Sequence, residues 1–481
     1  MSITSSHAHA PARTAFTPTR LISSDAEALH VAQEVAHQLA PGASQRDRDR
    51  PLPGPELDTL SSSGLLAVTV PRTYGGADVS YLTVARIFQI LSAADPAIGQ
   101  LPQNHFVFLD AIRQDGTPAQ KAHFFAEVLA GARFGNAQAE RGSSSALDLK
   151  TRLTRAPNGD YTLDGTKYYC TGAIVAHWIP VAALDDNNRL VLAYVQKNAP
   201  GVDVRPDWNA MGQRVTFSGT TILNNVIVPA AHIIEHWKLF DRPTLFHSFA
   251  SLLHAAIDVG IAQNALEDTA TLLRSRKRPR LGAAVERPLD DPHVITRFGQ
   301  LATHFHAAEE LLLHAAQLLD RAAPNVNAQN AAEASVAVSE AKAFSEDVAI
   351  EVTSDLFSLV GSASTDDDLN LHRHWRNART HTVHDANQWR YHSAGNYFLN
   401  GVAPGKPIRH PAAEGEAAAY AAATATAAAT AAATAASIPV AMTPPPLARS
   451  QPSAPTATAT SASASATAAS TPLTTATRQP R

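Results

Sequence analysis

The sequence has little of what many cofactor and metal sites require. It has one cysteine, Cys170, which excludes intrachain disulfides and cysteine-based zinc or iron–sulfur sites and indicates a reducing compartment, by default the cytoplasm. It has no GxGxxG, Walker A, HExxH or GxSxG motif, which argues against nicotinamide dehydrogenases, ATPases, zinc proteases and α/β-hydrolases. The net charge of −4 gives no reason to expect nucleic acid or a membrane surface as a partner.

Long apolar runs are also missing. The best candidate, Ser248 to Ala262, is interrupted by His254 and Asp258 and falls short of the roughly 18 residues that span a bilayer, so no membrane helix is predicted. Residues 1–20 lack the apolar core of a secretory signal, and residues 404–481 consist largely of Ala, Thr, Pro and Ser. Such segments bury too little apolar surface to offset the entropy of ordering, so both ends are predicted to be disordered.

The remaining chain changes its hydrophobic period twice. Residues 21–133 read mainly as helices, the first with Asp25 as its cap, and residues 134–236 read as short alternating strands separated by turns such as Asn158-Gly159. Residues 237–403 return to the helical period in long runs at 245–274, 293–320 and 328–360. The prediction is an α+β fold with an N-terminal helical domain, a middle β domain and a C-terminal four-helix bundle.

Three local patterns carry candidate chemistry, and the first contains His381, His384 and Asp385. On a helix the two histidines would share a face at i, i+3 with the carboxylate beside them, which suits general acid–base work near neutral pH. A metal site is the rival interpretation, although no third-ligand pattern accompanies the histidines. A polar network that holds a helix end together with Arg376 and Arg379 fits the pattern equally well.

The second pattern is a run of five cations, Arg274, Arg276, Lys277, Arg278 and Arg280, at a predicted helix end. It suits a phosphate, since arginine binds phosphate in bidentate geometry, and it also suits a solvated helix C-terminus. The third is a turn and strand from Asp164 to Gly172, in which Tyr169 and Thr171 are predicted to face one side. This strand could support a flavin ring or be an ordinary half-buried strand.

Taken in order, several segments resemble the acyl-CoA dehydrogenase superfamily, and within it the flavin-dependent monooxygenase branch of dibenzothiophene monooxygenase and the sulfur-acquisition oxidoreductases. The segments are ADPAIGQLPQNH, FGNAQAERG, YTLDGTKYYCTGA, WNAMGQRVTFSGT and HWRNARTHTVHDANQWRYHSAGNYFLNG. The resemblance extends over about 21–401 and implies the same α–β–α fold. It also implies a homodimer or homotetramer. Gln103-Asn104-His105 is closer to the sulfur-acquisition relatives, which favours a small organosulfur substrate.

The resemblance offers two chemistries. In the monooxygenase branch, reduced FMN from a separate NAD(P)H-flavin reductase reacts with O₂ to give a C4a-(hydro)peroxyflavin, and this function is favoured here because the histidine-rich segment matches. His384 is then the group nearest the flavin, and His381 assists as a donor or proton relay. The alternative is an FAD-dependent acyl-CoA dehydrogenase in which Asp385 takes the place of the usual glutamate base. A third hypothesis is a catalytically silent scaffold whose tail recruits a partner.

The resemblance also assigns a flavin site, with FMN favoured and FAD as the alternative. Thr171 is predicted to act both in catalysis and in flavin binding, and no metal ligand is predicted. The further flavin-binding candidates, beside His384 itself, are Asn136, Tyr169, Trp208, Arg276, Arg278, Gly361 and Ser362.

Overall fold

The computed structural model describes residues 19–142, 148–276, 279, 282 and 284–404. All of these described residues belong to one compact unit. The predicted disordered ends fall almost wholly outside the described residues, as do Lys277, Arg278 and Arg280 of the cationic run. Among the described residues no helix is long and apolar enough to cross a membrane.

The N-terminal region is helical, as predicted. Its helices are α1 (Asp25–Leu39), α2 (Ala43–Asp49), α3 (Gly54–Ser63), α4 (Tyr81–Ala94), α5 (Pro96–Gln100), α6 (Gln103–Asp115) and α7 (Pro118–Leu129). Helices α1, α4, α5 and α7 begin at capping side chains. The cap of α1 is Ser24, whose side chain accepts from the Glu27 N–H, so the prediction of Asp25 is wrong. Asp25 instead accepts from the backbone and hydroxyl of Ser80, the cap of α4, and so ties α1 to α4.

The middle region forms one seven-stranded sheet in the order β5-β6-β2-β1-β3-β4-β7. The strands are β1 (Arg152–Arg155), β2 (Tyr161–Lys167), β3 (Trp178–Leu184), β4 (Leu190–Gln196), β5 (Val202–Val204), β6 (Thr221–Val228) and β7 (Ile233–Ile234). All residues of β3 are buried because the strand is covered on both faces. Trp178 and Ala182 join the large core shared with the helices, whereas Ile179 and Val181 join a second core within the sheet.

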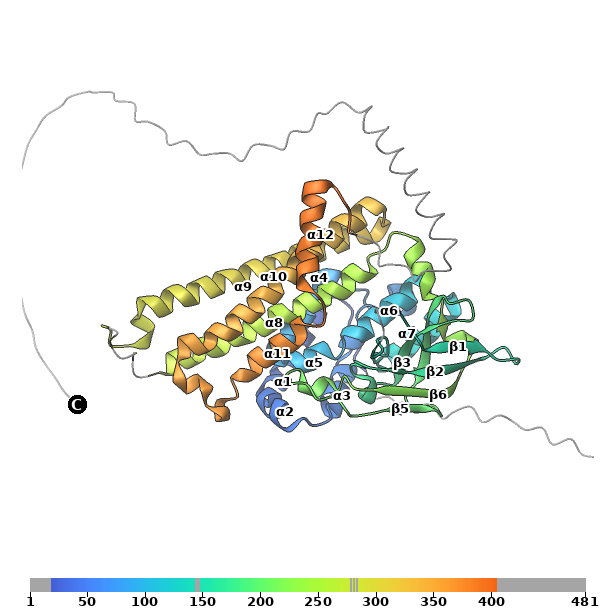
Figure 1. Cartoon of the computed structure of the whole chain (residues 1–481), viewed down its shortest axis with the longest axis horizontal. Coiled ribbons are helices and arrows are strands. Elements are labelled where there is room, and N and C mark those ends of the chain that lie inside the picture. Colours follow the sequence, from blue (N-terminus) through green and yellow to red (C-terminus); the bar gives the residue numbers. More distant parts are fainter. Residues whose placement is uncertain (1–18, 143–147, 277–278, 280–281, 283, 405–481) are drawn as a thin grey trace, which may run out of the picture. The chain divides into compact units, whose positions relative to one another are not determined.

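The C-terminal region is built on three long helices, α8 (Phe246–Ser275), α9 (Pro292–Ala322) and α10 (Ala328–Val360), which lie side by side in Figure 1. Their bounds agree with the predicted runs to within two residues. Helix α10 packs along both α8 and α9, and α4 packs on α8, which joins the bundle to the N-terminal helices. Two shorter helices follow, α11 (His372–Thr382) and α12 (Asn387–Asn400).

The bundle core contains charged side chains as well as apolar ones. Asp258 of α8 and Lys342 of α10 are fully buried, and Glu346 and His381 are exposed by 2% and 1%. Buried charges are costly unless they are paired and hydrogen-bonded, so such a group in a core marks a place where polarity is needed.

Candidate active site

Three histidines meet where the N-terminal half of α8 passes the end of α11. His254 Nδ1 lies 3.0 Å from His381 Nε2, and His384 Nδ1 lies 3.0 Å from the backbone oxygen of His381. The rings of His254 and His384 stack with their centroids 3.9 Å apart. We refer to these three residues as the histidine cluster. His384 lies beyond the end of α11 rather than on it, so the predicted helical i, i+3 pair is formed by a turn instead.

The hydrogen bonds limit where the ring hydrogens of this cluster can lie. A carbonyl oxygen only accepts, so Nδ1 of His384 carries a hydrogen and its Nε2 is the free ring nitrogen. His381 uses both ring nitrogens, because Nδ1 lies 2.6 Å from Asp258 Oδ1 and Nε2 faces His254. Buried and fully engaged, His381 is placed to act on other groups through His254 and not by direct contact with a ligand. His384 is exposed and His254 is half-buried.

Charged groups behind the histidine cluster form a second set, the buried charge cluster of Asp258, Lys342, Glu346 and His381. Lys342 Nζ lies 3.4 Å from Asp258 Oδ2 and forms a close ion pair with Glu346 Oε1. Burial raises the pKa of Asp258, but His381 and Lys342 outweigh that effect and hold it below its ordinary value. Burial also raises the pKa of Glu346, to about 7, against the opposing effect of Lys342.

Sequence reasoning missed His254, Asp258, Lys342 and Glu346 as site residues. The sequence did contain a signal for these residues. His254 and Asp258, four residues apart, interrupt the most apolar run of the chain, and Lys342 and Glu346, also four residues apart, interrupt the apolar pattern of α10. Ionisable residues at i, i+4 share one helix face, so two such pairs on apolar helices indicate a polar seam between the helices.

Asp385, the candidate dehydrogenase base, is held by an arginine. Its Oδ2 accepts from Arg390 Nε at 2.9 Å and from Nη2 at 2.5 Å, and Arg390 also donates to Ser251 of α8. Burial raises the pKa of Asp385, but the Arg390 guanidinium outweighs this and holds it below the ordinary value. A carboxylate stabilised in this way is a poor base for removing a carbon-bound proton.

The flavin candidates of the β domain lie around the end of β2. Tyr169 has a φ of 56°, in the left-handed region, and β2 ends at Lys167, so the prediction that the strand continues through Thr171 is wrong. Tyr169 is 55% exposed, whereas Thr171 is buried and its hydroxyl lies 2.8 Å from that of Ser218. Cys170 between them is buried in the sheet core.

The same region offers groups that fit a flavin ring. Asn136 donates to the Tyr169 backbone oxygen at 3.1 Å, and its own Oδ1 is buried with no hydrogen-bond partner among the described residues. An unpaired buried acceptor is costly unless a ligand satisfies it, and the flavin ring carries an N–H donor. The Tyr169 and Trp208 rings pack edge to face, with their centroids 6.1 Å apart. They form an aromatic surface beside this acceptor.

Hydrogen bonds on two sides link this region to the elements that carry the histidine cluster. Gln213, whose backbone oxygen accepts from Trp208 Nε1, has its N–H bonded at 2.7 Å to Asn377, one turn before His381 on α11. On the other side, Gln138 contacts Asn104 at the start of α6. The neighbouring Gln103 donates to the Ala250 oxygen, one turn before His254 on α8. The structure thus gathers the β-domain candidates and the histidine cluster around α6 and α11.

Arg276, Gly361 and Ser362 form a separate group. The Arg276 guanidinium donates to the Val360 oxygen next to Gly361, so these candidates do lie together. However, 22 residues of α8 separate Arg276 from His254, which is roughly 33 Å at the helical rise. Arg278 lies outside the described residues. His105 belongs to the Gln103-Asn104-His105 segment that favoured a small substrate. It is buried, with Nε2 bonded to the Leu66 oxygen and Nδ1 accepting from the Phe134 N–H.

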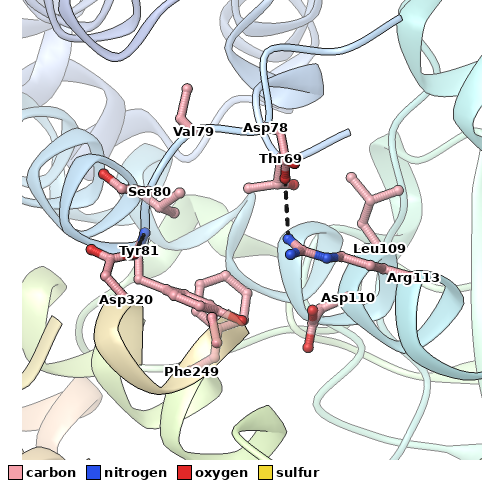
Figure 2. A pocket seen from close by; sticks show the side chains of 12 residues that line it. Thr69, Asp78, Val79, Ser80, Tyr81, Leu109, Asp110, Arg113, Phe249 and Asp320 are labelled. Atoms are coloured by element: carbon pink, nitrogen blue, oxygen red, sulfur yellow. Dashed lines mark hydrogen bonds and ion pairs between the residues drawn. The ribbon is translucent and has the colours of Figure 1, made fainter. Parts of the chain in front are cut away.

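A cavity of about 180 Å³ lies farther along α6 and α8, and it contains none of the predicted site residues (Figure 2). Its walls include Tyr81, Phe249 and the buried carboxyl of Asp110, and the Arg113–Asp78 ion pair crosses it at 3.4 Å. Burial raises the pKa of Asp110 to about 6. In the described part of the chain, no group of three or more His, Cys, Asp or Glu side chains is placed to hold a metal ion.

Comparison with known proteins identifies the family. Sequence models of the acyl-CoA dehydrogenase N-terminal, middle and C-terminal domains match residues 26–132, 137–226 and 252–389. Dibenzothiophene monooxygenase of Mycolicibacterium goodii is 31% identical over 401 residues, which cover 80% of this chain and 96% of that protein. The chain belongs to the acyl-CoA dehydrogenase family. The predicted fold and resemblance are therefore confirmed.

Other acyl-CoA dehydrogenase relatives lie in the same branch. The probable FMNH2-dependent monooxygenase SfnC of Pseudomonas putida is 29% identical, over 78% of this chain and 96% of that protein. The crystal structure of FMN-bound TdsC from Paenibacillus sp. A11-2 is 30% identical with a TM-score of 0.76, covering 79% of this chain and 99% of that one. These matches confirm the prediction that the chain is a flavin-dependent oxidoreductase.

Proposed function

We propose that this chain is the oxygenase of a two-component monooxygenase. It uses reduced FMN supplied by a separate NAD(P)H-flavin reductase, activates O₂ as a C4a-(hydro)peroxyflavin and oxygenates a small organosulfur compound, in the cytoplasm. The observation that carries the proposal is the histidine cluster, which lies next to Asp385, the residue that takes the place of the dehydrogenase glutamate in the resemblance. The relatives named for monooxygenase activity and for FMNH2 support the choice of chemistry and cofactor.

Each candidate has a part in this proposal that follows from its contacts. His384 would offer Nε2, the ring nitrogen that its bond to the His381 oxygen leaves open, as a hydrogen-bond acceptor beside the flavin. Asn136 Oδ1 would accept the flavin N–H, and Thr171, Tyr169 and Trp208 would hold the ring. When bound, reduced FMN supplies the electrons that reduce O₂.

The acyl-CoA dehydrogenase alternative has less support. It needs Asp385 as a base, and the Arg390 pair stabilises the ionised carboxylate and so weakens it as a base. It also leaves three histidines and a buried charge cluster without a part in the reaction.

We also propose that the enzyme is a homodimer or homotetramer in which one copy completes the site of another. Arg276, Gly361 and Ser362 are too far from His254 to reach the same FMN within one copy, so they serve the phosphate end of a flavin held by a second copy. The exposed large apolar side chains near the end of the described chain favour such contact, among them Trp389 at 67% and Leu399 at 85% exposure.

Rapid mixing tests the proposal. The protein and FMNH2 are mixed anaerobically and then with O₂, with a dialkyl sulfide, a sulfone and an alkanesulfinate as substrates. We expect a transient oxygen adduct of the flavin and an oxygenated product from one substrate class. The variant His384→Gln should release hydrogen peroxide in place of product, whereas His306→Gln, an exposed histidine on α9, should behave as the wild type. Absence of both adduct and product, with bleaching of bound FAD by acyl-CoA, would instead establish the dehydrogenase.

A further inference from the structure

The buried charge cluster can hold one proton in two places. Lys342 and ionised Asp258 cancel each other's charge, which leaves Glu346 and His381. With Glu346 protonated and His381 neutral the cluster has no net charge, and with Glu346 ionised and His381 an imidazolium it again has none. Any other assignment leaves an uncompensated charge in the bundle core, which is strongly unfavourable.

Glu346 is placed to exchange a proton with solvent. It lines a pocket of about 430 Å³ between α10, the end of α11 and the start of α12. Its Oε2 is buried and has no hydrogen-bond partner among the described residues, and the Thr382 hydroxyl, which lines the same pocket, is also unpartnered. Two unpaired polar atoms beside one pocket favour water there. The carboxyl of Glu346 thus lies between the buried lysine and a hydrated pocket.

Whether His381 is neutral or an imidazolium determines whether Nε2 of His254 accepts or donates a hydrogen bond. Neutral His381 keeps its hydrogen on Nδ1 toward Asp258, so its Nε2 accepts from His254 Nδ1–H and His254 Nε2 is left without a hydrogen. An imidazolium at His381 donates from Nε2 to His254 Nδ1, and the hydrogen of His254 then sits on Nε2. His254 changes from acceptor to donor at the ring that stacks on His384.

We propose that Glu346 is a proton-storing positioning residue, which, through Lys342, Asp258 and His381, sets whether Nε2 of His254 offers a lone pair or an N–H beside His384. In the exchange, one proton leaves Glu346 for the solvent of the pocket and one enters at His254 Nε2, while the His254 Nδ1 hydrogen moves to His381 Nε2. Nothing is oxidised, and the net charge stays constant. The inference goes further than the proposed function but uses it for its purpose, since a monooxygenase must both accept and return protons at one site.

The groups around Glu346 come from every element packed against it. Its raised pKa, about 7, keeps both the protonated and the ionised carboxyl accessible near neutral pH. The charged or titratable side chains that face it or share its pocket are Asp258 from α8, Lys342, Asp347 and Glu351 from α10, Arg379 from α11, Asp385 beyond α11 and Tyr391 from α12.

Infrared spectroscopy of the flavin-free protein tests the inference without any enzymatic activity. In a temperature series at fixed pH in D₂O, the buried carboxylic acid band and the ¹⁵N NMR signals of the His254 ring should change in parallel, because the exchange conserves protons and its position does not depend on pH. Glu346→Gln should remove the carboxylic acid band and the coupled histidine change. The control Glu351→Gln removes a carboxylate that lines the same pocket but pairs with Arg297 and His304, and it should leave both signals in place.

Other outcomes would overturn the inference. If the band is absent in the wild type, or persists in Glu346→Gln, then Glu346 does not store the proton. If the band is present but the histidine signals change independently of it, the coupling is wrong. Should Glu346→Gln fold poorly, Lys342→Met gives a second test, because loss of the ammonium should hold Glu346 protonated, so that the band stays constant over the temperature series and the coupled histidine change is lost. These readings do not depend on FMN, so they remain valid if the proposed function fails.

Discussion

Lys342→Met is the perturbation whose outcome the structure defines most closely. The substitution replaces the one lysine of the buried charge cluster by an apolar side chain of similar length. Asp258 and Glu346, both almost fully buried, then face each other's charge without that cation. Removing one partner of a buried ion pair typically costs about 3–5 kcal/mol, mainly because the remaining charge is left uncompensated.

The loss of unfolding free energy caused by Lys342→Met should depend on pH. In the variant the carboxyl group of Glu346, whose pKa burial raises to about 7 even beside Lys342, loses that opposing cation, so its folded-state pKa lies above its unfolded value and the folded state binds its proton more tightly than the unfolded chain. Such groups stabilise the fold at low pH and lose that contribution as the pH rises through the folded-state pKa. We expect the loss of unfolding free energy to be about 3–5 kcal/mol at pH 8 and smaller at pH 6, where Glu346 takes up a proton.

Urea unfolding at pH 6 and pH 8 measures both quantities. The control is Lys197→Met, since Lys197 is a half-buried lysine that donates to the Ile174 carbonyl at 3.0 Å and has no part in the cluster. The loss of unfolding free energy caused by Lys197→Met should be the same at both pH values. The double variant Lys342→Met/Glu346→Gln should be more stable at pH 8 than Lys342→Met alone. An equal cost for Lys342→Met at both pH values would refute the account of this cluster.

Three further variants test other parts of the account. Asp110→Asn removes a carboxyl whose pKa burial raises to about 6. Because ionisation of this buried carboxyl destabilises the wild type as the pH rises, the free energy of unfolding of the variant, measured in urea, should exceed that of the wild type by up to about 3 kcal/mol at pH 8 and by little at pH 4. Asn136→Leu should weaken FMN binding by about 0.5–1.5 kcal/mol in a flavin fluorescence titration, and unchanged affinity would remove Asn136 from the site. Arg390→Met should lower the free energy of unfolding, measured by thermal unfolding, by about 1 kcal/mol at pH 7 and leave it unchanged near pH 3. The reason is that the ion pair of Arg390 with Asp385, which lowers the pKa of that carboxyl, stabilises the fold only while the carboxyl is ionised.

Periodicity predicted the architecture because apolar spacing is a local property. The run at 328–360 coincides with α10, and the sheet lies between the two helical regions as expected. Local pattern could not show that β2 ends before Tyr169, because the left-handed backbone there depends on contacts such as the Asn136 bond to its oxygen. It also placed His384 on a helix that ends two residues earlier.

The candidate site was predictable only in part, for a physical reason. His381 and His384 are neighbours in sequence and formed a visible motif, whereas Asp258 and His254 approach His381 from 123 and 127 residues away. Contacts over such separations arise from the packing of α8 against α11, which no local pattern encodes. The Asp385–Arg390 pair is the converse case, since five residues separate the partners but the turn between α11 and α12 decides that they meet.

The most direct test of the central claim is the fate of molecular oxygen. The protein is supplied with FMNH2, ¹⁸O₂ and the organosulfur compound that gives product in the rapid-mixing experiment, and the product is analysed by mass spectrometry. The account predicts one ¹⁸O atom in each product molecule and a large loss of this label in His384→Gln. Product without the label, or hydrogen peroxide as the only fate of the oxygen, would contradict it.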